Sequence, residues 1–351
     1  MKIRLLIVDD SALMRRHLRQ LFEQEGDFDI RLARNGVEAI REARDFHPDV
    51  VTLDINMPEM DGLTALSHLM GITDAPVIML SSLTERGALV TLEALALGAV
   101  DFVAKPGGTI SLSLDEVRTE LLTKVRVAIK SRPRKAPRIE LPTPPKPAPT
   151  VTRRFGTQEK CELIVVGVST GGPGTLETIL PRLDGAFPVP IVIAQHMPDS
   201  FTGAFAQRLN QASQLTVIEL GKTTVLEAGH VYIARGGADA VISKRNGRLV
   251  AMPRPAVVSH LWHPSVELLM RSAMDNVAGE NLVGVMLTGM GSDGAEAFTE
   301  LKQRGGRIIA EAEESAVVFG MPKEVIRRGA ATEVLPAEHI ARQLENWCST
   351  R

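Results

Sequence analysis

An apolar strand runs directly into a serine and a glycine-rich turn in the stretch Leu163-Ile164-Val165-Val166-Gly167-Val168-Ser169-Thr170-Gly171-Gly172-Pro173. The segment 167–171 satisfies the pattern G-x-S-x-G, whose glycines let the backbone turn sharply and hold the serine hydroxyl clear of the sheet. A helix that begins after this turn presents unpaired main-chain N–H groups, as an anion or a developing oxyanion requires. The stretch therefore predicts a nucleophile at Ser169, while a phosphate-binding turn or an ordinary tight turn remains open.

A serine nucleophile needs a base and a group that orients the base, and two later strands end in suitable side chains. His196 follows the apolar segment 190–195, and Asp293 follows the apolar segment 282–287. Parallel strands share one edge at their carboxyl ends, so these two side chains can meet Ser169 there. Such a histidine is more often a core or surface group, and an Asp-Gly pair is more often a turn or helix cap. The pattern alone therefore leaves the triad a hypothesis, and its order differs from that of α/β-hydrolases.

The composition restricts the class of protein. With 351 residues, 44% of them hydrophobic and 23% charged, the chain is long enough for two globular domains. A net charge of −2 and the lack of a nucleic-acid-binding motif argue against DNA or RNA as a partner. No apolar stretch is long enough to insert into a membrane, and with only two cysteines the chain is expected to be cytoplasmic.

Isolated cysteines and histidines suggest no metal cluster. Cys161 and Cys348 are too few and too isolated for a disulfide framework. His260 and His263 are closely spaced, but they lack nearby acidic or thiol partners and are interpreted as packing or surface groups.

Residues 130–158 are expected to be a linker between a domain over residues 1–129 and a domain over residues 159–351. They hold seven of the 21 prolines and many basic side chains, with scarcely an apolar cluster. Proline favours a stiff, extended polyproline conformation. The positive charge is interpreted as a solvated tether, with docking on an acidic partner as the alternative.

Five apolar strands alternate with five helical patterns before the linker. This order predicts a doubly wound parallel sheet with its ligand site at the carboxyl ends of the strands. Asp9 and Asp10 follow the first strand, Asp54 the third, Ser81 the fourth and Lys105 the fifth. Three clustered carboxylates repel one another unless a hard cation binds, and Mg²⁺ suits such oxygen ligands. Asp54 could then accept a phosphoryl group as an aspartyl phosphate.

This set of residues, together with Asp54-Ile55-Asn56-Met57-Pro58, Asp61-Gly62 and Lys105-Pro106, resembles that of response-regulator receiver domains. The resemblance implies that Asp54 is the phosphoacceptor. It also implies that Mg²⁺ is held by Asp9, Asp10, Asp54 and the main-chain carbonyl of Asn56. Ser81 and Phe102 would form the switch that responds to phosphorylation, with Lys105 beside the phosphoryl group. An ordinary core role for the Phe102 ring remains an alternative.

The second domain again alternates strands and helices. Short strands near Val217 and at 231–234, 240–243 and 248–251 interrupt the order, and Asn246-Gly247 is a hairpin turn signal. We therefore expect a mostly parallel α/β sheet with an antiparallel hairpin insertion.

Over essentially its whole length the chain resembles the CheB family of chemotaxis protein-glutamate methylesterases. The matching stretches are the segment 167–173, Gln195-His196-Met197-Pro198, Thr288-Gly289-Met290-Gly291-Ser292-Asp293-Gly294 and Phe319-Gly320-Met321-Pro322. The resemblance implies that Ser169 is the nucleophile, His196 the base and Asp293 the orienting acid. The main-chain N–H of Met290 would lie in the oxyanion hole, and the esterase reaction would need no cofactor.

The family resemblance also implies substrates and partners. The substrates would be glutamyl γ-methyl esters, and glutamines for deamidation, on cytoplasmic helices of methyl-accepting chemoreceptors, and a chemotaxis histidine kinase would donate the phosphoryl group. The phosphorylated receiver would uncover the serine. Two alternatives remain: a hydrolase of the same fold with another substrate, and a phosphorylation-switched scaffold without catalysis.

The chain departs from the family pattern at two places. The segment Trp262-His263-Pro264-Ser265-Val266-Glu267 stands where the family often has His-x-Pro-Ser-Val-Asp, and Arg235 and Asp239 stand where proline and histidine are common. These changes are interpreted as neutral ones in structural turns, with altered substrate docking as the alternative.

Overall fold

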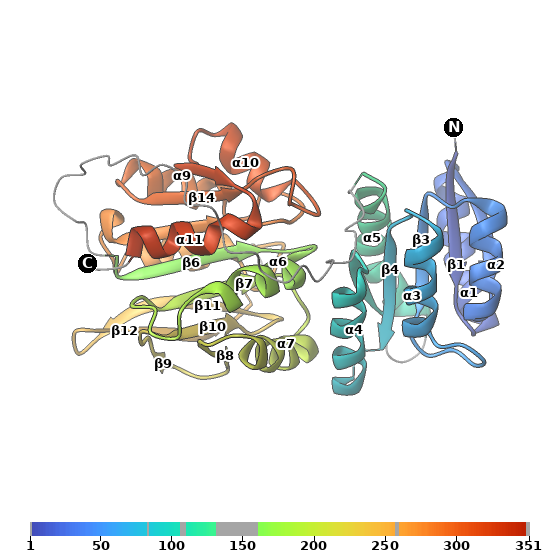
Figure 1. The fold of residues 1–351 in the computed structure, drawn as a ribbon, viewed down its shortest axis with the longest axis horizontal. Coiled ribbons are helices and arrows are strands. Elements are labelled where there is room, and N and C mark those ends of the chain that lie inside the picture. Colours follow the sequence, from blue (N-terminus) through green and yellow to red (C-terminus); the bar gives the residue numbers. More distant parts are fainter. Residues whose placement is uncertain (1, 83, 106–109, 131–160, 257–259, 349–351) are drawn as a thin grey trace, which may run out of the picture.

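Two α/β units make up the protein, as the computed structural model in Figure 1 shows. The structure describes residues 2–82, 84–105, 110–130, 161–256 and 260–348. The linker expected over 130–158 therefore lies, apart from Lys130, outside the described residues, as does Pro106 of the Lys105-Pro106 pair. Among the described helices, none is both long enough and apolar enough to cross a bilayer.

The first unit is a five-stranded parallel sheet with strand order β2-β1-β3-β4-β5, which confirms the doubly wound prediction. Short polar side chains start its helices: Ser11, Asn35, Asp61 and Thr84 each accept a hydrogen bond from a main-chain N–H of the first turn. Its elements are β1 (Ile3–Val8), α1 (Ala12–Glu25), β2 (Phe28–Ala33), α2 (Gly36–Phe46), β3 (Val50–Asp54), α3 (Gly62–Ile72), β4 (Val77–Ser82), α4 (Glu85–Leu97), β5 (Asp101–Lys105) and α5 (Ile110–Ala128).

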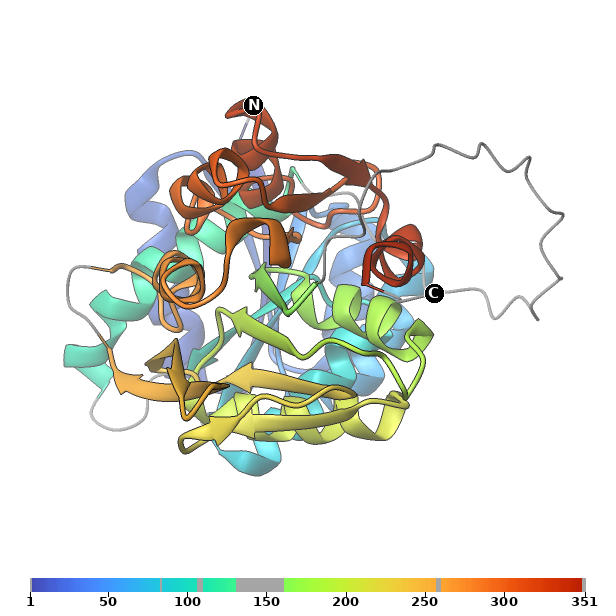
Figure 2. The same cartoon turned by 90° about the vertical axis from the view of Figure 1, so that its left-hand side faces the viewer.

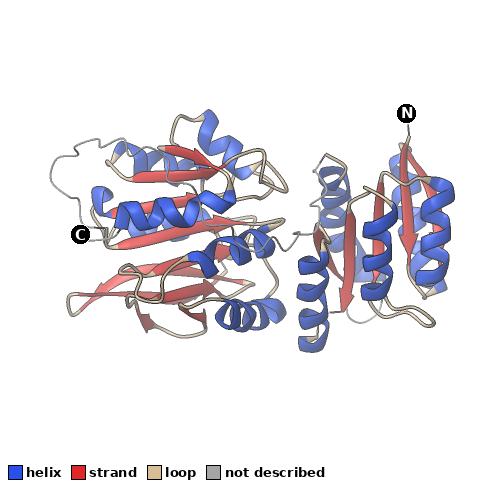
Figure 3. Ribbon diagram, viewed as in Figure 1, coloured by secondary structure: helices blue, strands red, loops and turns tan. Residues whose placement is uncertain are grey.

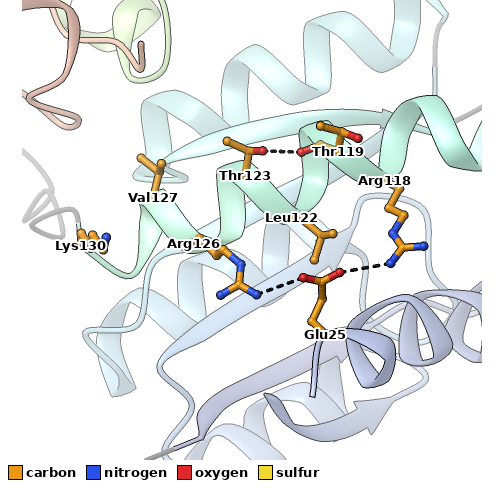
Figure 4. A pocket seen from close by; sticks show the side chains of 8 residues that line it. All are labelled: Glu25, Arg118, Thr119, Leu122, Thr123, Arg126, Val127 and Lys130. Atoms are coloured by element: carbon orange, nitrogen blue, oxygen red, sulfur yellow. Dashed lines mark hydrogen bonds and ion pairs between the residues drawn. The ribbon is translucent and has the colours of Figure 1, made fainter. Parts of the chain in front are cut away.

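Ion pairs hold α5 against the end of α1. Arg118 and Arg126 both contact Glu25, at 3.1 and 3.2 Å, and Arg126 also contacts Asp27 at 2.6 Å. A groove of about 440 Å³ runs along α5, and Glu25, Arg118 and Arg126 are among the residues that border it (Figure 4). Because Glu25 ends α1 just before β2 begins, the groove lies at the amino-terminal edge of the sheet, away from the predicted phosphorylation site.

The second unit has a seven-stranded parallel sheet in the order β15-β14-β13-β6-β7-β10-β8 and a three-stranded antiparallel sheet in the order β11-β12-β9 (Figure 3). Its elements are β6 (Leu163–Val168), α6 (Gly172–Ile179), η1 (Leu180–Arg182), β7 (Ile191–Gln195), α7 (Asp199–Ala212), β8 (Thr216–Leu220), β9 (Thr224–Val225), β10 (His230–Ala234), β11 (Ala238–Arg245), β12 (Arg248–Pro255), α8 (Val266–Met274), η2 (Gly279–Asn281), β13 (Leu282–Met286), α9 (Ala295–Gln303), β14 (Arg307–Glu311), α10 (Met321–Arg327), β15 (Glu333–Leu335) and α11 (Ala337–Cys348).

The parallel sheet with an antiparallel insertion is thus confirmed, and two of the short strands can now be assigned. The strand near Val217 (β8) and the strand at 231–234 (β10) pair in parallel within the main sheet. The antiparallel insertion consists of β9, β11 and β12. The local sequence pattern does not name the partner of a strand, so only the structure separates these two groups.

Three central strands carry the catalytic candidates. Every residue of β6, β7 and β13 is buried, as expected for parallel strands that helices cover on both faces. The strands lie side by side in the order β13, β6, β7, so the segments that follow their carboxyl ends meet at one edge.

The two units pack against each other through α4, which contacts α6 and α7 (Figure 1). The Phe102 ring of β5 stacks on the Phe201 ring of α7, with ring centroids 4.4 Å apart. The apolar core of one unit is continuous with that of the other across this contact. Figure 2 views the molecule from the second unit, with the first unit behind it.

The two cysteines lie together, although they are distant in the sequence. Both are free thiols, and a hydrogen bond between them lowers the pKa of Cys161 and raises that of Cys348. The expectation that they are isolated was wrong, because the C-terminal end of α11 packs beside the start of β6.

Candidate active site and phosphorylation site

Ser169 lies in a sharp turn between β6 and α6. Its main-chain N–H donates to the carbonyl of Thr288 at 2.9 Å, and its carbonyl accepts from the N–H of Gly172 at 2.8 Å. Gly171 has a φ of +78°, which glycine adopts without steric cost. The turn therefore has the tight geometry that the G-x-S-x-G pattern predicts.

His196 and Asp293 form a hydrogen-bonded pair at the end of the sheet. The imidazole Nε2 lies 2.9 Å from Oδ2 of Asp293, and the two side chains are only 6% and 9% exposed. The other ring nitrogen, Nδ1, is buried and has no hydrogen-bond partner among the described residues. A histidine whose Nε2–H donates to the carboxylate keeps Nδ1 free to accept a proton.

The N-terminus of α8 holds the Asp293 carboxylate. The main-chain N–H groups of Val266 and Glu267 donate to it at 2.8 and 3.1 Å, and the Ser265 hydroxyl donates at 3.3 Å. Burial acts to raise the pKa of Asp293, but the bonds from His196 and from the two amides hold that pKa below its ordinary value. Asp293 is therefore an anion that can stabilise a protonated His196.

Gln195 joins the nucleophile turn to the histidine and was not singled out from the sequence. It is 2% exposed, and its Nε2 donates to the carbonyls of Ser169 at 3.0 Å and His196 at 3.1 Å. The available signal was a polar residue at the last position of an otherwise apolar, buried strand. One amide group thus fixes the backbones of the nucleophile and of the base relative to each other.

Two main-chain N–H groups that are unpaired among the described residues lie near the serine, one directly after it and one in the loop after β13, where a Cβ on Gly289 would stand 2.7 Å from that of Ser169. Thr288 is tied in place because its N–H donates to the buried Glu311 at 2.7 Å and its hydroxyl donates to the Thr170 carbonyl at 2.8 Å. The N–H groups of Met290 and Thr170 donate no hydrogen bond within the described part of the chain. Such free amides suit a developing oxyanion.

His263 contacts an acidic side chain. The sequence-based interpretation that this histidine has no acidic partner was therefore wrong. Its Nδ1 lies 3.0 Å from Oδ1 of Asp239, a fully buried carboxylate that also accepts from the N–H of Ser265 at 2.8 Å. The two residues are 24 positions apart, so only the packing of β11 against the segment before α8 brings them together. Arg235, the other departure, lies on the surface, 3.9 Å from Asp199.

The predicted phosphorylation site forms at the carboxyl ends of β1, β3 and β5. Carboxylate oxygens of Asp9, Asp10 and Asp54 all lie within 4.8 Å of one another. The Lys105 ammonium contacts Asp9 at 2.8 Å and Asp54 at 2.7 Å. Ser81 is fully buried on the neighbouring strand β4. The structure therefore brings Asp9, Asp10, Asp54 and Lys105 together, with Ser81 on the adjacent strand, where its hydroxyl contacts that of Thr91 at 2.6 Å. Asn56 follows in the loop after Asp54, and its carbonyl stays a predicted ligand.

Charge at this site is unbalanced. Burial raises the pKa of Asp54 to about 6, against the lowering effect of Lys105, and Asp9 and Asp10 add to the rise. Although burial opposes the charged ammonium, Asp54 and Asp9 hold the pKa of Lys105 above its ordinary value. One cation facing three carboxylates leaves a negative excess, and an all-oxygen set of this kind fits a hard divalent cation such as Mg²⁺.

The raised pKa of Asp54 predicts a pH-dependent cost to stability in the metal-free protein. Between pH 3.8, the ordinary pKa, and about 6, the folded state holds a proton that the unfolded state has released. Stability is therefore lost as the pH rises through this window, by up to about 3 kcal/mol. With a chelator at pH 7.5, we expect Asp54→Asn to unfold at a higher temperature than the wild type.

Calorimetry from pH 4 to 7.5 checks this expectation. The difference in unfolding temperature between Asp54→Asn and the wild type should shrink toward pH 4. Added Mg²⁺ should raise the unfolding temperature of the wild type more than that of the variant. The exposed Asp74, replaced by asparagine, is the matched control. An Asp54→Asn protein no more stable than the wild type at pH 7.5 in chelator would contradict the charge imbalance.

Comparison with known proteins identifies relatives along the whole chain. The response regulator receiver domain family matches residues 5–114, and the CheB methylesterase family matches residues 164–344. A protein-glutamate methylesterase/protein-glutamine glutaminase of Rhodospirillum rubrum is 52% identical over 99% of this chain and 96% of its own length. A relative of the same name from Rhodopseudomonas palustris is 48% identical over 98% of each chain. The crystal structure of the Thermotoga maritima CheB methylesterase catalytic domain is 39% identical, with a TM-score of 0.52, and covers 53% of this chain and 98% of its own.

Proposed function

The chain belongs to the CheB methylesterase family and is a protein-glutamate methylesterase/protein-glutamine glutaminase with a receiver domain, and from that premise we propose that phosphorylation of the receiver controls a serine hydrolase that acts on chemoreceptors. The observation that carries the proposal is the His196–Asp293 pair, held beside the Ser169 turn where the receiver packs. The proposed parts are a receiver over residues 1–129, a linker over 130–158 and a catalytic domain over 159–351.

The proposed reaction begins when Nδ1 of His196 takes the hydroxyl proton of Ser169. The serine oxygen attacks the carbonyl carbon of a glutamyl γ-methyl ester, and the oxyanion accepts hydrogen bonds from the free amides of Met290 and Thr170. The Nε2–H group of His196 remains hydrogen-bonded to Asp293, and the negative charge of this carboxylate stabilises the imidazolium. His196 then gives its proton to the leaving methoxide, which departs as methanol.

Water completes the cycle. His196 removes a proton from a water molecule, the hydroxide attacks the acyl-serine carbonyl, and the protonated histidine returns the proton to Ser169 as the glutamate leaves. With a glutamine substrate the same steps release ammonia in place of methanol. No cofactor takes part in the proposed esterase chemistry.

Contacts between the receiver and the nucleophile turn support the proposed control. The hydroxyl of Thr170, next to Ser169, donates to Asp101 of the receiver at 2.6 Å, and this bond is buried. Phe102 follows Asp101, and its ring stacks on Phe201. A receiver in this position would hinder a protein substrate from reaching Ser169, and a phosphorylated receiver that docks less well would uncover it.

The proposed phosphoacceptor is Asp54, with Ser81, Lys105 and Phe102 as the residues that respond. Mg²⁺, held by Asp9, Asp10, Asp54 and the Asn56 carbonyl, would supply neutralising charge for the incoming phosphoryl group. Lys105 already contacts Asp54 and could pair with a phosphoryl oxygen. Phe102 lies between the Lys124 ammonium, 5.2 Å from its centroid, and the catalytic domain, so a rearrangement at β5 would reach the domain contact directly.

Methanol release from methylated chemoreceptor cytoplasmic fragments tests the proposed substrate. We expect the wild type to release methanol, and faster with acetyl phosphate and Mg²⁺ or with a chemotaxis histidine kinase as phosphodonor. These substrates and the kinase place the proposed reaction in the cytoplasm. No release from any receptor, while a fluorophosphonate still labels Ser169, would favour a hydrolase with another substrate. No release and no labelling would favour the non-catalytic scaffold.

Loss of the Asp101–Thr170 bond should activate the unphosphorylated protein. A buried hydrogen bond whose partner is removed costs about 1–3 kcal/mol, which corresponds to a 5- to 150-fold larger open population. We expect Asp101→Ala to raise basal methanol release within that range, as measured by initial rates without phosphodonor. Asp101 belongs to the receiver, so the substitution leaves the catalytic residues intact.

Two controls accompany this variant. Replacement of the exposed Asp74 by alanine should leave the basal rate unchanged, and phosphoryl uptake by Asp101→Ala should show that its receiver is folded. A folded Asp101→Ala protein with the basal rate of the wild type would refute inhibition through this contact.

A further inference from the structure

Trp262 covers the catalytic histidine. Its indole ring lies nearly parallel to the imidazole of His196, with an interplanar angle of 11° and ring centroids 5.4 Å apart. An aromatic face next to an imidazole stabilises the protonated ring and restricts its rotation. Because His196 must carry a proton during the proposed reaction, the position of Trp262 bears on the rate.

A buried carboxylate fixes the residues that follow Trp262. Oδ1 of Asp239, on β11, contacts Nδ1 of His263 at 3.0 Å and the N–H of Ser265 at 2.8 Å. Asp239 is fully buried, whereas the His263 side chain is 20% exposed. One carboxylate thus anchors the segment at two points directly after the indole.

The same segment reaches the other side of the catalytic pair. The Ser265 hydroxyl accepts from the N–H of Leu268 at 3.2 Å and so starts α8, while it donates to Asp293. The next two amides of this helix also donate to Asp293. The segment 262–267 therefore contacts the base through its indole and the orienting acid through its amides.

We propose that Asp239 is a positioning residue for the esterase reaction. Through His263 and Ser265 it holds the Trp262 ring on His196 and, at the same time, the N-terminus of α8 on Asp293. The proposal rests on the proposed function, since it assigns Asp239 to the support of the Ser169, His196 and Asp293 triad. Its removal should misplace both catalytic side chains, and a displacement of about 1 Å can lower a rate about 100-fold.

Turnover by the full-length chain with phosphodonor tests the proposal. We expect Asp239→Ala to lower kcat for methanol release about 10- to 100-fold and to change KM less than threefold. Asp239→Asn keeps an acceptor oxygen and should recover part of the loss. Asp275→Ala, an exposed aspartate at the other end of α8, is the matched control and should behave as the wild type.

Tryptophan fluorescence separates a positioning role from a structural one. The chain has two tryptophans, so Trp347→Phe leaves Trp262 as the reporter. The stacked imidazole shields one face of the indole, so we expect acrylamide to quench Trp262 more strongly in His196→Gln than in the wild type. Asp239→Ala should show the same stronger acrylamide quenching of Trp262 without loss of the folded state, as judged by circular dichroism.

The outcomes decide between the possibilities. A folded Asp239→Ala protein with kcat within threefold of the wild type, or with the same acrylamide quenching of Trp262 as the wild type, overturns the proposal. If that variant does not fold, His263→Ala, which removes one of the two groups that Asp239 holds, decides by the same two measurements. The rate at which a fluorophosphonate labels Ser169 is a readout independent of the receptor substrate. If the fluorophosphonate does not label Ser169 in the wild type, the proposed triad itself is wrong.

Discussion

Ser169→Ala should abolish methyl ester hydrolysis, with kcat reduced about 10⁴- to 10⁶-fold. Without the hydroxyl, His196 and Asp293 have no nucleophile to activate, and loss of one member of such a triad costs nearly as much as loss of all. The small methyl side chain fits the existing turn, because Ser169 is held there through main-chain bonds to Thr288 and Gly172. The measurement is methanol release from methylated receptor fragments, by phosphodonor-treated protein.

A matched serine shows that the effect belongs to position 169. Ser243 lies on β11 in the same domain, and Ser243→Ala should retain the activity of the wild type. Binding of receptor fragments by Ser169→Ala should also persist, since only the hydroxyl is lost. Turnover by Ser169→Ala within tenfold of the wild type would mean that another group attacks the ester.

Asp54→Asn should abolish both phosphoryl incorporation and the rise in activity that a phosphodonor produces. The amide nitrogen replaces the oxygen that would bond to phosphorus, so no acyl phosphate forms. Asparagine is nearly isosteric, and Lys105 keeps Asp9 as a partner at 2.8 Å, so the receiver should remain folded. The checks are radiolabel incorporation from acetyl phosphate with Mg²⁺ and methanol release before and after the donor is added.

The basal rate of methanol release by Asp54→Asn makes this experiment specific. Without a phosphodonor this rate should be close to that of the wild type, because Asp54 takes no part in the esterase chemistry. Asp74→Asn, an exposed aspartate of the same domain, should incorporate phosphate normally. Stimulation of Asp54→Asn equal to that of the wild type would show that the donor acts elsewhere on the protein.

Local sequence patterns predicted much of the fold and of the candidate site. Apolar runs alternating with helical patterns predicted both parallel sheets, because this periodicity reflects which faces are buried. Strand ends followed by Ser169, His196 and Asp293 predicted the catalytic edge, and five strand-end residues predicted the phosphorylation site. Family motifs then assigned their roles, which the proposed experiments test.

Contacts between residues distant in the sequence could not be predicted from the sequence. The strands β8 and β10 pair within the parallel sheet, Cys161 lies beside Cys348, and His263 contacts Asp239. None of these contacts was predicted. Sequence spacing carries no information about such pairs, because they depend on how two distant elements pack. The bridging role of Gln195 was not predicted for another reason. A single polar residue at the end of a strand does not show locally which backbones its side chain will contact.

By itself the sequence determined which chemical groups follow which strand, since glycine turns, caps and apolar periodicity act over a few residues. Only the tertiary structure decided that Nε2 of His196 faces Asp293, that the α8 N-terminus and Asp239 support this pair, and that β5 of the receiver contacts the nucleophile turn. The physical reason is that hydrogen bonds of about 3 Å demand an orientation. Orientation between elements is set by the packing of the whole core.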